Sequence, residues 1–420
     1  MKAFFLFLKR RHYIKKMYHV IDDVSKNRTL WALSIVCLLW SVSSCMVFSL
    51  LPTFITEELK VSTKHLGWIE GIAISCAFIA KVISGILSDH FQKRKPLLIF
   101  GTLFSFLFKS LFALATNGWW IFFAKSLDRF AKGVRSSPVD ALIADIAPKN
   151  KQATCYGLRQ SLYIFGAVIG SLLASYLFSI SHKNYRFVFW LSLIPVFVSL
   201  IVIIFYIKDF LKESLNKNQE RTLRWKISEM RLLKAEFWQL IIVSFILMMS
   251  RFSESFLVLK GRSVGIDVTM LPIFMVGYEL MHSCFAYPIG ILADRFNRRW
   301  ILFFGIIVLV MTNAFMYFSH SPYGILMGYL LAGLHMGITH GLLSALIAEN
   351  TPTHLRGTGF SVYYFSTGIA ILLANPLAGH LSHVFDASMP FLGGGVFSTL
   401  SAVTLFFIIK KEKNIKRVNE

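Results

Sequence analysis

A ten-residue segment occurs twice in this chain, and nearly half of the chain separates the two copies. Residues 85–94 read GILSDHFQKR, and residues 290–299 read GILADRFNRR, with an offset of 205 positions. A second pair, residues 141–148 (ALIADIAP) and 345–352 (ALIAENTP), repeats with an offset of 204 positions. Two separate segments that repeat at nearly one offset predict a duplicated chain whose halves share one structure.

The composition indicates that both halves lie in a membrane. Of the 420 residues, 55% are hydrophobic and only 16% are charged, whereas about 25% are charged in a soluble protein. Only helices can cross lipid in blocks of roughly 20 apolar residues, because each backbone polar group must be satisfied within its own segment. Twelve such spans are predicted, over residues 30–54, 65–88, 96–115, 119–141, 155–181, 186–207, 237–259, 270–293, 300–319, 322–348, 357–383 and 389–410.

The predicted fold is therefore all-α and membrane-integral, with twelve transmembrane helices in two pseudo-symmetric six-helix bundles. A polar, mixed-charge stretch divides six spans from six. In a membrane protein, two repeated bundles can rock about a site between them. The predicted organisation is a basic N-terminal segment (1–29), a first bundle (30–207), a linker (208–236), a second bundle (237–410) and a tail (411–420).

The net charge of +22 does not indicate nucleic-acid binding, because of where the charges lie. Lysine and arginine gather in both tails, in the linker and after spans two and eight, whereas loops 116–118 and 320–321 contain neither. This asymmetry predicts that the linker and both termini are cytoplasmic. Contact with anionic membrane lipids is expected as a minor role.

The repeated segment has the chemistry of a latch between helices. Each copy places an aspartate at a cytoplasmic helix end, with a glycine four positions before it and basic residues after it. The carboxylate can cap a neighbouring helix and pair with a cation, and the glycine allows close helix contact. The alternative is a charged loop that only fixes topology. The predicted gating residues are Asp89, Arg94, Asp294, Arg298, Gly85 and Gly290.

This doubled loop resembles motif A of the major facilitator superfamily, which follows the second and eighth of that family's twelve helices. The resemblance covers residues 30–410 and implies the fold of that superfamily and a transport function. The family pattern has glycine at the positions of Gln92 and Asn297. Asparagine tolerates a left-handed backbone better than glutamine does, so the first copy departs further from the pattern.

Span four carries a second resemblance. Residues 129–133 (RFAKG) look like the family's Arg-x-x-Gln-Gly motif B, with Lys132 in the position of the glutamine. Residues 128–142 resemble a bacterial branch that reads DRxGKGxRxxPRDAL, from which Ala131 and Val139 depart. The family's antiporter motif in span five is missing, since residues 166–170 (GAVIG) contain no proline. This absence disfavours drug–proton antiport.

Span four also contains a stripe of charges. Lys125, Asp128, Arg129, Lys132 and Arg135 recur at spacings of three and four, so they share one helix face. Each charge at the bilayer centre costs about 2.5–3.5 kcal/mol on insertion scales, so these side chains must face a wet cavity or one another. One carboxylate cannot neutralise four cations. The positive surplus predicts an anionic or zwitterionic solute.

Further ionisable groups occur in spans seven, eight and ten. Arg251 and Glu254 lie three apart in span seven, which predicts that they share one helix face, and Glu279 and His282 have the same spacing in span eight. A buried carboxylate can carry a proton near neutral pH; the alternatives are a static Arg251–Glu254 ion pair and an interhelical polar contact of Glu279. The predicted solute-binding residues are Arg129, Lys132, Arg251 and Lys125, the predicted proton-coupling residues are Glu254, Asp128 and Glu279, and His335 and His340 are core residues or solute contacts.

The sequence contains no pattern for a cofactor or a catalytic centre. It lacks the phosphate-binding pattern Gly-x-x-x-x-Gly-Lys-Ser/Thr, so the expected energy source is the proton gradient, with a sodium gradient as the alternative. The five cysteines show no metal-binding spacing, and the two histidines of span ten have no paired carboxylate or thiolate. We therefore expect neither an enzyme nor a metal or cofactor site.

The resulting hypothesis is a monomeric secondary active transporter of the bacterial inner membrane. The first choice is proton-coupled uptake (symport) of a carboxylate, an amino acid or a carboxylate siderophore. The second is export of a metabolite or drug. A non-transporting membrane receptor or assembly protein is the alternative from another class. The expected partners are the solute, protons and membrane lipids.

Overall fold

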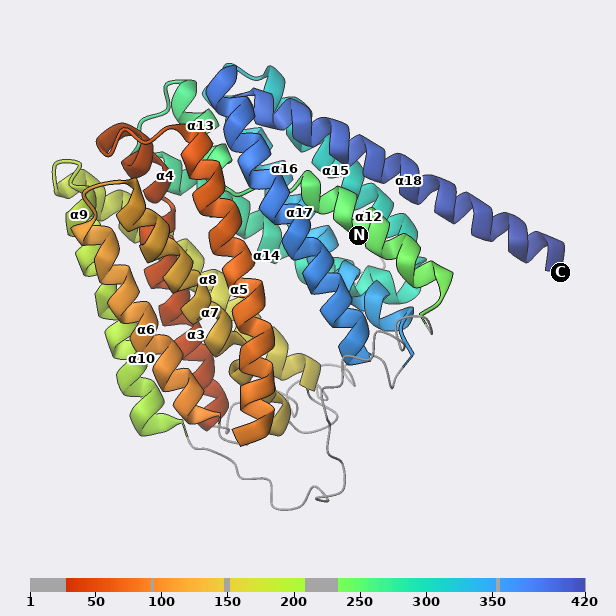
Figure 1. Cartoon of the computed structure of the whole chain (residues 1–420), viewed down its shortest axis with the longest axis horizontal. Helices are drawn as coiled ribbons and strands as arrows, with labels where there is room; N and C mark the ends of the chain where they lie inside the picture. The colour runs from red at the N-terminus through yellow and green to blue at the C-terminus, as the bar shows by residue number, and fades with distance from the viewer. Residues whose placement is uncertain (1–27, 92–93, 147–151, 208–232, 353–355, 420) are drawn as a thin grey trace, which may run out of the picture.

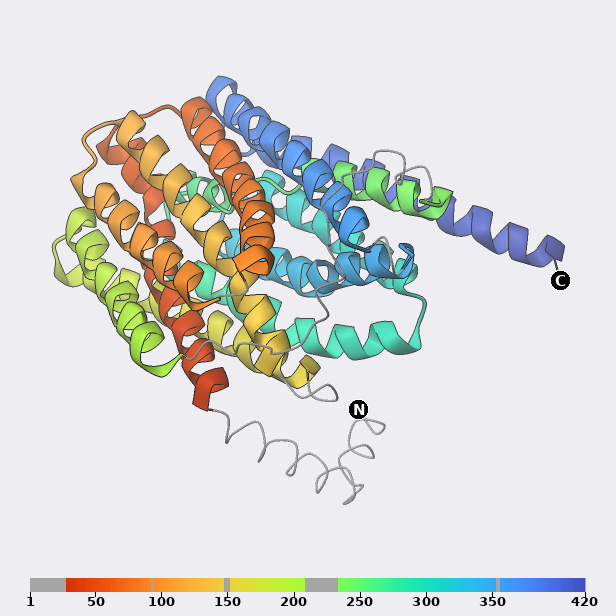
Figure 2. The same ribbon diagram turned by 60° about the horizontal axis from the view of Figure 1, so that its bottom comes forward.

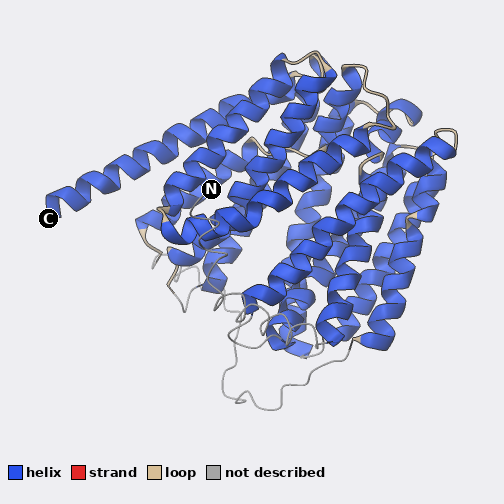
Figure 3. Cartoon of the chain, turned by 180° about the vertical axis from the view of Figure 1, so that it is seen from behind, coloured by secondary structure: helices blue, strands red, loops and turns tan. Residues whose placement is uncertain are grey.

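The computed structural model describes residues 28–91, 94–146, 152–207, 233–352 and 356–419. All regular secondary structure in these ranges is helical, and the helices form two bundles (Figures 1 and 3). This arrangement confirms the predicted all-α fold. The N-terminal segment and most of the linker lie outside the described residues.

The six spans of the first bundle begin and end within about five residues of the predicted positions. Span one is completed by a short helix and a π-helix after Phe48, and span six is interrupted at Ser192. The elements are α3 (Arg28–Phe48), α4 (Leu51–Thr53), η1 (Phe54–Glu58), α5 (Thr63–Phe91), α6 (Lys95–Leu114), α7 (Gly118–Ile146), α8 (Gln152–Ile180), α9 (Tyr185–Leu191) and α10 (Leu193–Tyr206).

The second bundle repeats this order of long helices, and its last helix projects well beyond the others (Figures 1 and 2). That helix runs nine residues past the predicted end of span twelve. The elements are α12 (Ala235–Met249), α13 (Ser255–Ser263), α14 (Leu271–Arg295), α15 (Arg298–Phe318), α16 (Pro322–Glu349), α17 (Arg356–Val384) and α18 (Met389–Asn419).

The outer surface of the helices is apolar, as lipid contact requires. Phe205, Phe318 and Phe407 are 74%, 73% and 63% exposed, respectively. Eight helical spans in the described ranges are long and apolar enough to cross a membrane. Helices α5, α7 and α14 are also long enough to cross a membrane, but each contains charged residues within its sequence. These charges therefore belong between helices rather than against lipid.

Span seven corrects the sequence analysis, because it is not one continuous helix. Helix α12 ends at Met249 and α13 begins at Ser255, with non-helical backbone between them. The Ser253 amide donates to the side-chain oxygen of Asn375 on α17 (2.7 Å). Exposed backbone groups are tolerated at membrane depth only where protein or a cavity satisfies them. The prediction that Arg251 and Glu254 share a helix face is therefore wrong.

The two bundles are in contact at one end. Here the end where α10 stops and α12 starts is the linker end, and the opposite end is the far end. Helices α5 and α17 lie side by side toward the far end and diverge toward the linker end (Figures 1 and 2). A Cβ on Gly67 would lie 2.4 Å from the backbone oxygen of Asn375, and one on Gly379 would lie 2.6 Å from that of Thr63. Only small residues permit this approach.

Within the first bundle, Gly133 sets the distance between α5 and α7. A Cβ at this position would lie 2.5 Å from the backbone oxygen of Ala77, so Gly133→Ala must push the two helices apart. We expect a cost of about 1–3 kcal/mol, measured as a lower thermal unfolding temperature of the purified protein. Gly341→Ala on α16 is the matched control, because a Cβ there meets nothing within 4 Å. Equal unfolding temperatures for the two variants would contradict this packing argument.

Candidate functional site

Two cations of α7 face the region between the bundles. The guanidinium of Arg129 lies 4.5 Å from the centre of the Phe48 ring, and Lys132 Nζ donates to the Tyr163 hydroxyl (3.3 Å). Both cations keep partial access to solvent. Aromatic faces stabilise cations without neutralising them, so the positive charge of both groups remains available to a solute.

The second bundle presents carboxylates and imidazoles. Glu254 stands just before α13 and is exposed, although the residues that follow it are buried. Its carboxylate accepts a hydrogen bond from the Tyr278 hydroxyl (3.1 Å). Next to Tyr278 on α14, Glu279 lies 3.9 Å from the His282 ring nitrogen. The His340 ring of α16 is 6.0 Å from that of His282, centre to centre.

The two sets of charges lie within electrostatic range of each other. Arg129 and Lys132 of the first bundle both act on the Glu254 carboxylate of the second. Cys45 of α3 lies near charges from both sides, including Lys132 and Glu279. Among the described residues, no carboxylate comes within 4 Å of Arg129 or Lys132. The structure thus brings together four of the predicted site residues, and three of them, Arg129, Lys132 and Glu254, have no ion-pair partner among the described residues.

Lys125 does not join this set. It is 2% exposed and forms an ion pair with Glu70 of α5, whose carboxylate also accepts a hydrogen bond from Ser255 of α13. Glu70 is not among the site residues that the sequence predicts. The sequence does offer one signal for Glu70, because it is a single carboxylate inside an apolar span. Residue spacing, however, cannot show that a cation on one helix pairs with a carboxylate on another helix.

Asp128 is also separated from the exposed charges. It is 1% exposed and accepts a hydrogen bond from Ser105 of α6 (2.6 Å). The buried Lys109, one turn further along α6, donates to Ser43 (2.8 Å) and Ser44 (3.0 Å) of α3. Asp128 thus belongs to the interior packing of the first bundle.

Arg251 has a different partner from the one considered in the sequence analysis. Its Nε donates to His335 Nε2 (2.9 Å), and a second guanidinium nitrogen donates to Thr339. His335 Nδ1 in turn contacts the backbone oxygen of Gly305 (2.7 Å). Since Nε2 accepts from Arg251, Nδ1 carries the proton and the ring is neutral. His335 therefore positions Arg251 and is buried in the core.

The gating residues are described in part. In the second half, Arg298 pairs with Glu349 (3.2 Å), so the two repeated segments of that half meet.

Asn297 is not left-handed, with φ at −62°, and its side chain caps α15 by accepting from the Arg299 amide (2.9 Å). A Cβ on Gly290 would meet nothing within 4 Å among the described residues, so the part of the chain that the structure describes shows no close helix contact there. Arg94 is half-buried just before α6, and the side chains of Asp89 and Asp294 and the surroundings of Gly85 lie outside the described part.

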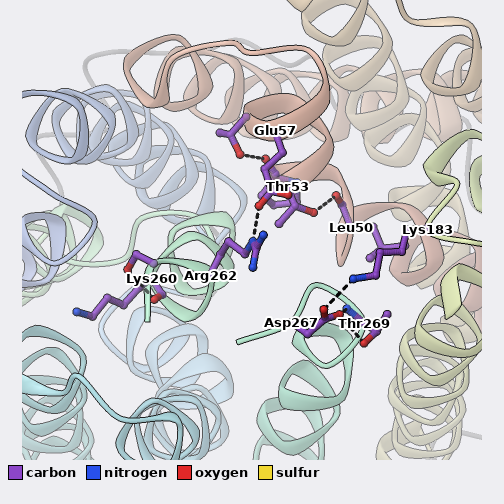
Figure 4. Close-up of polar contacts among 11 residues, drawn as sticks. Leu50, Thr53, Glu57, Lys183, Lys260, Arg262, Asp267 and Thr269 are labelled. Carbon is purple, nitrogen blue, oxygen red and sulfur yellow. Dashed lines mark hydrogen bonds and ion pairs between the residues drawn. The ribbon is translucent and has the colours of Figure 1, made fainter. Parts of the chain in front are cut away.

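At the far end, two ion pairs join the bundles (Figure 4). Arg262, in the last turn of α13, pairs with Glu57 of η1 (2.5 Å), and Lys183 pairs with Asp267 (2.8 Å). The Ser175 hydroxyl of α8 also donates to the backbone oxygen of Thr269 (2.5 Å). Hydrogen bonds from Lys183 and Thr269 hold the pKa of Asp267 well below its usual range. Because its pKa is lowered, this carboxylate is ionised at every pH above the ordinary pKa of an aspartate. The pair therefore persists between pH 5 and 8.

A protein-family comparison identifies the architecture. The family model described as the Major Facilitator Superfamily matches residues 29–260 and 255–420. The chain belongs to this superfamily. It is therefore a multi-pass membrane transporter and not an enzyme, and its partner is a small-molecule solute.

Individual relatives of this superfamily member are distant. An uncharacterized major-facilitator-type transporter of Methanocaldococcus jannaschii is 28% identical over 92% of this chain and 96% of the relative. The cis,cis-muconate transport protein of Acinetobacter baylyi is 23% identical, covering 90% and 93%. The crystal structure of the nucleoside transporter NupG has a TM-score of 0.72 at 13% identity, covering 91% of this chain and 98% of that one.

The Glu57–Arg262 pair yields a prediction about far-end closure in this transporter. Arg262→Glu places like charges together, and we expect the ratio of far-end-open to far-end-closed molecules to rise about fivefold, as about 1 kcal/mol for an exposed pair implies. The measurement is the spin-label distance between cysteines introduced at the exposed far-end residues Thr116 and His320, after the five native cysteines are replaced.

The exchanged pair is the control for this prediction. Glu57→Arg combined with Arg262→Glu restores opposite charges, so the double variant should return to the parental distance distribution. If the double variant opens as far as the single one, the pair does not hold the far end closed.

Proposed function

We propose that this transporter moves a small zwitterionic solute, with an amino acid as the first choice, across the membrane by alternating access. The observation that carries the proposal is the unpaired charge on both sides of the interface. Arg129 and Lys132 of the first bundle suit a carboxylate, and Glu254 and Glu279 of the second suit an ammonium group. One solute that binds both sides would neutralise charges that are costly to leave bare in a membrane.

A carboxylate without an amino group is the second candidate. Arg251, already oriented by His335, would add a third cation for it, and the muconate carrier among the relatives supports a carboxylate substrate. In that case Glu254 and Glu279 would have to be protonated while the solute is bound. A carboxylate siderophore belongs to this same class of solute, and metabolite or drug export remains the alternative direction.

Proton coupling is proposed for the carboxylates that solvent can reach. Glu254 is exposed and Glu279 is partly exposed, so either can exchange a proton when the site opens. Asp128 is less suited, because it is buried against Ser105. Loading on one side of the membrane and release on the other would tie solute movement to the proton gradient.

The orientation follows from the charge of the loops. We propose that the linker end faces the cytoplasm of a bacterial cell, since the basic residues of the sequence gather there. The far end then faces outward, and the structure, joined at the far end, is inward-facing. The protein would work as a monomer in the inner membrane.

The test is accumulation of labelled solutes in proteoliposomes with an imposed proton gradient. The panel contains zwitterionic amino acids, dicarboxylates, ferric carboxylate chelates and organic cations. We expect amino acids to accumulate. Arg129→Ala and Lys132→Ala should each lower uptake at least tenfold, because each removes a charged hydrogen bond of about 1.5–3 kcal/mol. Glu254→Gln should raise KM for the amino acid.

Lys64→Ala is the matched control, because Lys64 is an exposed cation at the far end. Accumulation of dicarboxylates that Glu254→Gln leaves intact would favour the second candidate. Transport of organic cations alone would refute the role given to the α7 cations, and no flux of any solute would favour the receptor alternative.

A further inference from the structure

Glu70 is the most deeply enclosed of the described carboxylates that touch both bundles. It lies on α5, is 1% exposed, and receives Lys125 Nζ from α7 and the Ser255 hydroxyl from α13 on the same oxygen, Oε1. Its other oxygen, Oε2, is buried without a hydrogen-bond partner among the described residues. One half of the carboxylate is thus saturated, and the other half can accept a proton.

The surroundings of Glu70 form the closed seam between the bundles. Gly67 and Gly71 flank it on α5 and touch α17 so closely that added Cβ atoms would lie 2.4 and 3.2 Å from its backbone. Asn375 of α17 caps the broken span through the Ser253 amide (2.7 Å). Opening of the far end must separate α5 from α17 and α13, and it therefore breaks the Ser255–Glu70 hydrogen bond.

The cations that face Glu70 come from helix α7 of its own bundle. Helix α7 contributes Lys125 in direct contact and Arg129 at longer range, and Glu254 before α13 acts on Lys125. The residues of α17 that lie closest to Gly67 and Gly71 are uncharged, namely Leu372, Asn375, Pro376 and Gly379. The ionised carboxylate is thus stabilised by one cation of its own bundle and by one hydroxyl of the other bundle.

We propose that Glu70 is a proton-binding lock, whose ionised form holds the far end closed through Ser255. When the far end opens, Glu70 loses the Ser255 hydroxyl and gains access to the outer solution. A proton from that solution binds Oε2, and the carboxylate becomes a neutral acid while Lys125 keeps its own proton. Closure restores the Ser255 hydrogen bond and the ion pair, and the proton passes from Oε2 to the solution at the linker end, which is then the open side of the molecule.

The lock deepens the proposed function and depends on it for its link to solute. Protonation of Glu70 frees the Lys125 ammonium, which then adds a cation to the solute site next to Arg129. Return of the proton-free carboxylate to Lys125 removes that cation. A proton and a solute carboxylate would in this way be bound together on one side and released together on the other.

The experiment measures the distance between the spin labels at Thr116 and His320 in liposomes, from pH 8 to pH 5, with no solute present. We expect the parental protein to shift toward the open far end at low pH. Glu70→Gln should lose this pH response, since its side chain is neutral at every pH. Ser255→Ala should weaken this pH response and raise the open-to-closed ratio at pH 8 about tenfold, the effect of a lost hydrogen bond of about 1.4 kcal/mol.

Two matched controls accompany these variants. Ser244→Ala removes another buried hydroxyl of span seven, one without a hydrogen-bond partner among the described residues, and it should leave the ratio unchanged. Glu236→Gln removes an exposed carboxylate of α12 and should leave the pH response unchanged.

A pH response that survives in Glu70→Gln would refute the proton-binding role. If Ser255→Ala gives the same open-to-closed ratio as Ser244→Ala, the lock is refuted. This comparison can be made even if Glu70→Gln does not fold. Because the distances need no solute, a failed uptake assay with an intact Glu70-dependent response would overturn the proposed function and leave the lock in place.

Discussion

The cost of placing charge in a bilayer determines how this protein is assembled. Helices α5, α7 and α14 carry ionisable groups in their interior, and none of these can face lipid without a large loss of free energy. The charges of these helices whose side chains the structure describes along the membrane interior, such as Glu70, Lys125, Arg129 and Lys132, are instead placed between helices, where they find an opposite charge, a hydroxyl, an aromatic face or solvent. The apolar helices can then form the outer surface, and the charged ones must meet near the interface of the two bundles.

Two types of charge result from this constraint. Lys125 and Glu70 are paired and buried, and they connect helices. Arg129, Lys132 and Glu254 keep contact with solvent and have no ion-pair partner within the described ranges. A buried pair that loses one partner leaves an uncompensated charge, which makes the first type suited to a two-state lock. The second type is suited to a ligand that arrives and leaves.

The sequence predicts the fold well because its signals are local. A block of apolar residues fixes a helix wherever it lies in the chain, and the duplication at residues 85–94 and 290–299 fixes the order of the halves. The stripe on span four likewise placed Arg129 and Lys132 correctly between helices. These inferences need only the period of one helix and the solvent around it.

The rest depends on contacts between distant segments. No spacing reveals that Lys125 pairs with Glu70, 55 positions earlier, or that Arg251 is held by His335, 84 positions later. The break in span seven was also missed, because the polar stretch from Ser250 to Ser255 is short beside the apolar residues around it. The side-chain oxygen of Asn375 on α17 accepts from the Ser253 amide in this break, a contact between segments far apart in the chain.

The two sets of contacts between the bundles differ in what can release them. The far-end ion pairs are exposed, so salt weakens them. The lowered pKa of Asp267 keeps its pair with Lys183 charged over the physiological pH range. Glu70 is enclosed and reaches the other bundle through one hydroxyl, so a single proton changes its bonding. A proton-driven transition therefore needs a group placed like Glu70, while the surface pairs set how firmly the closed far end is held once that group is ionised.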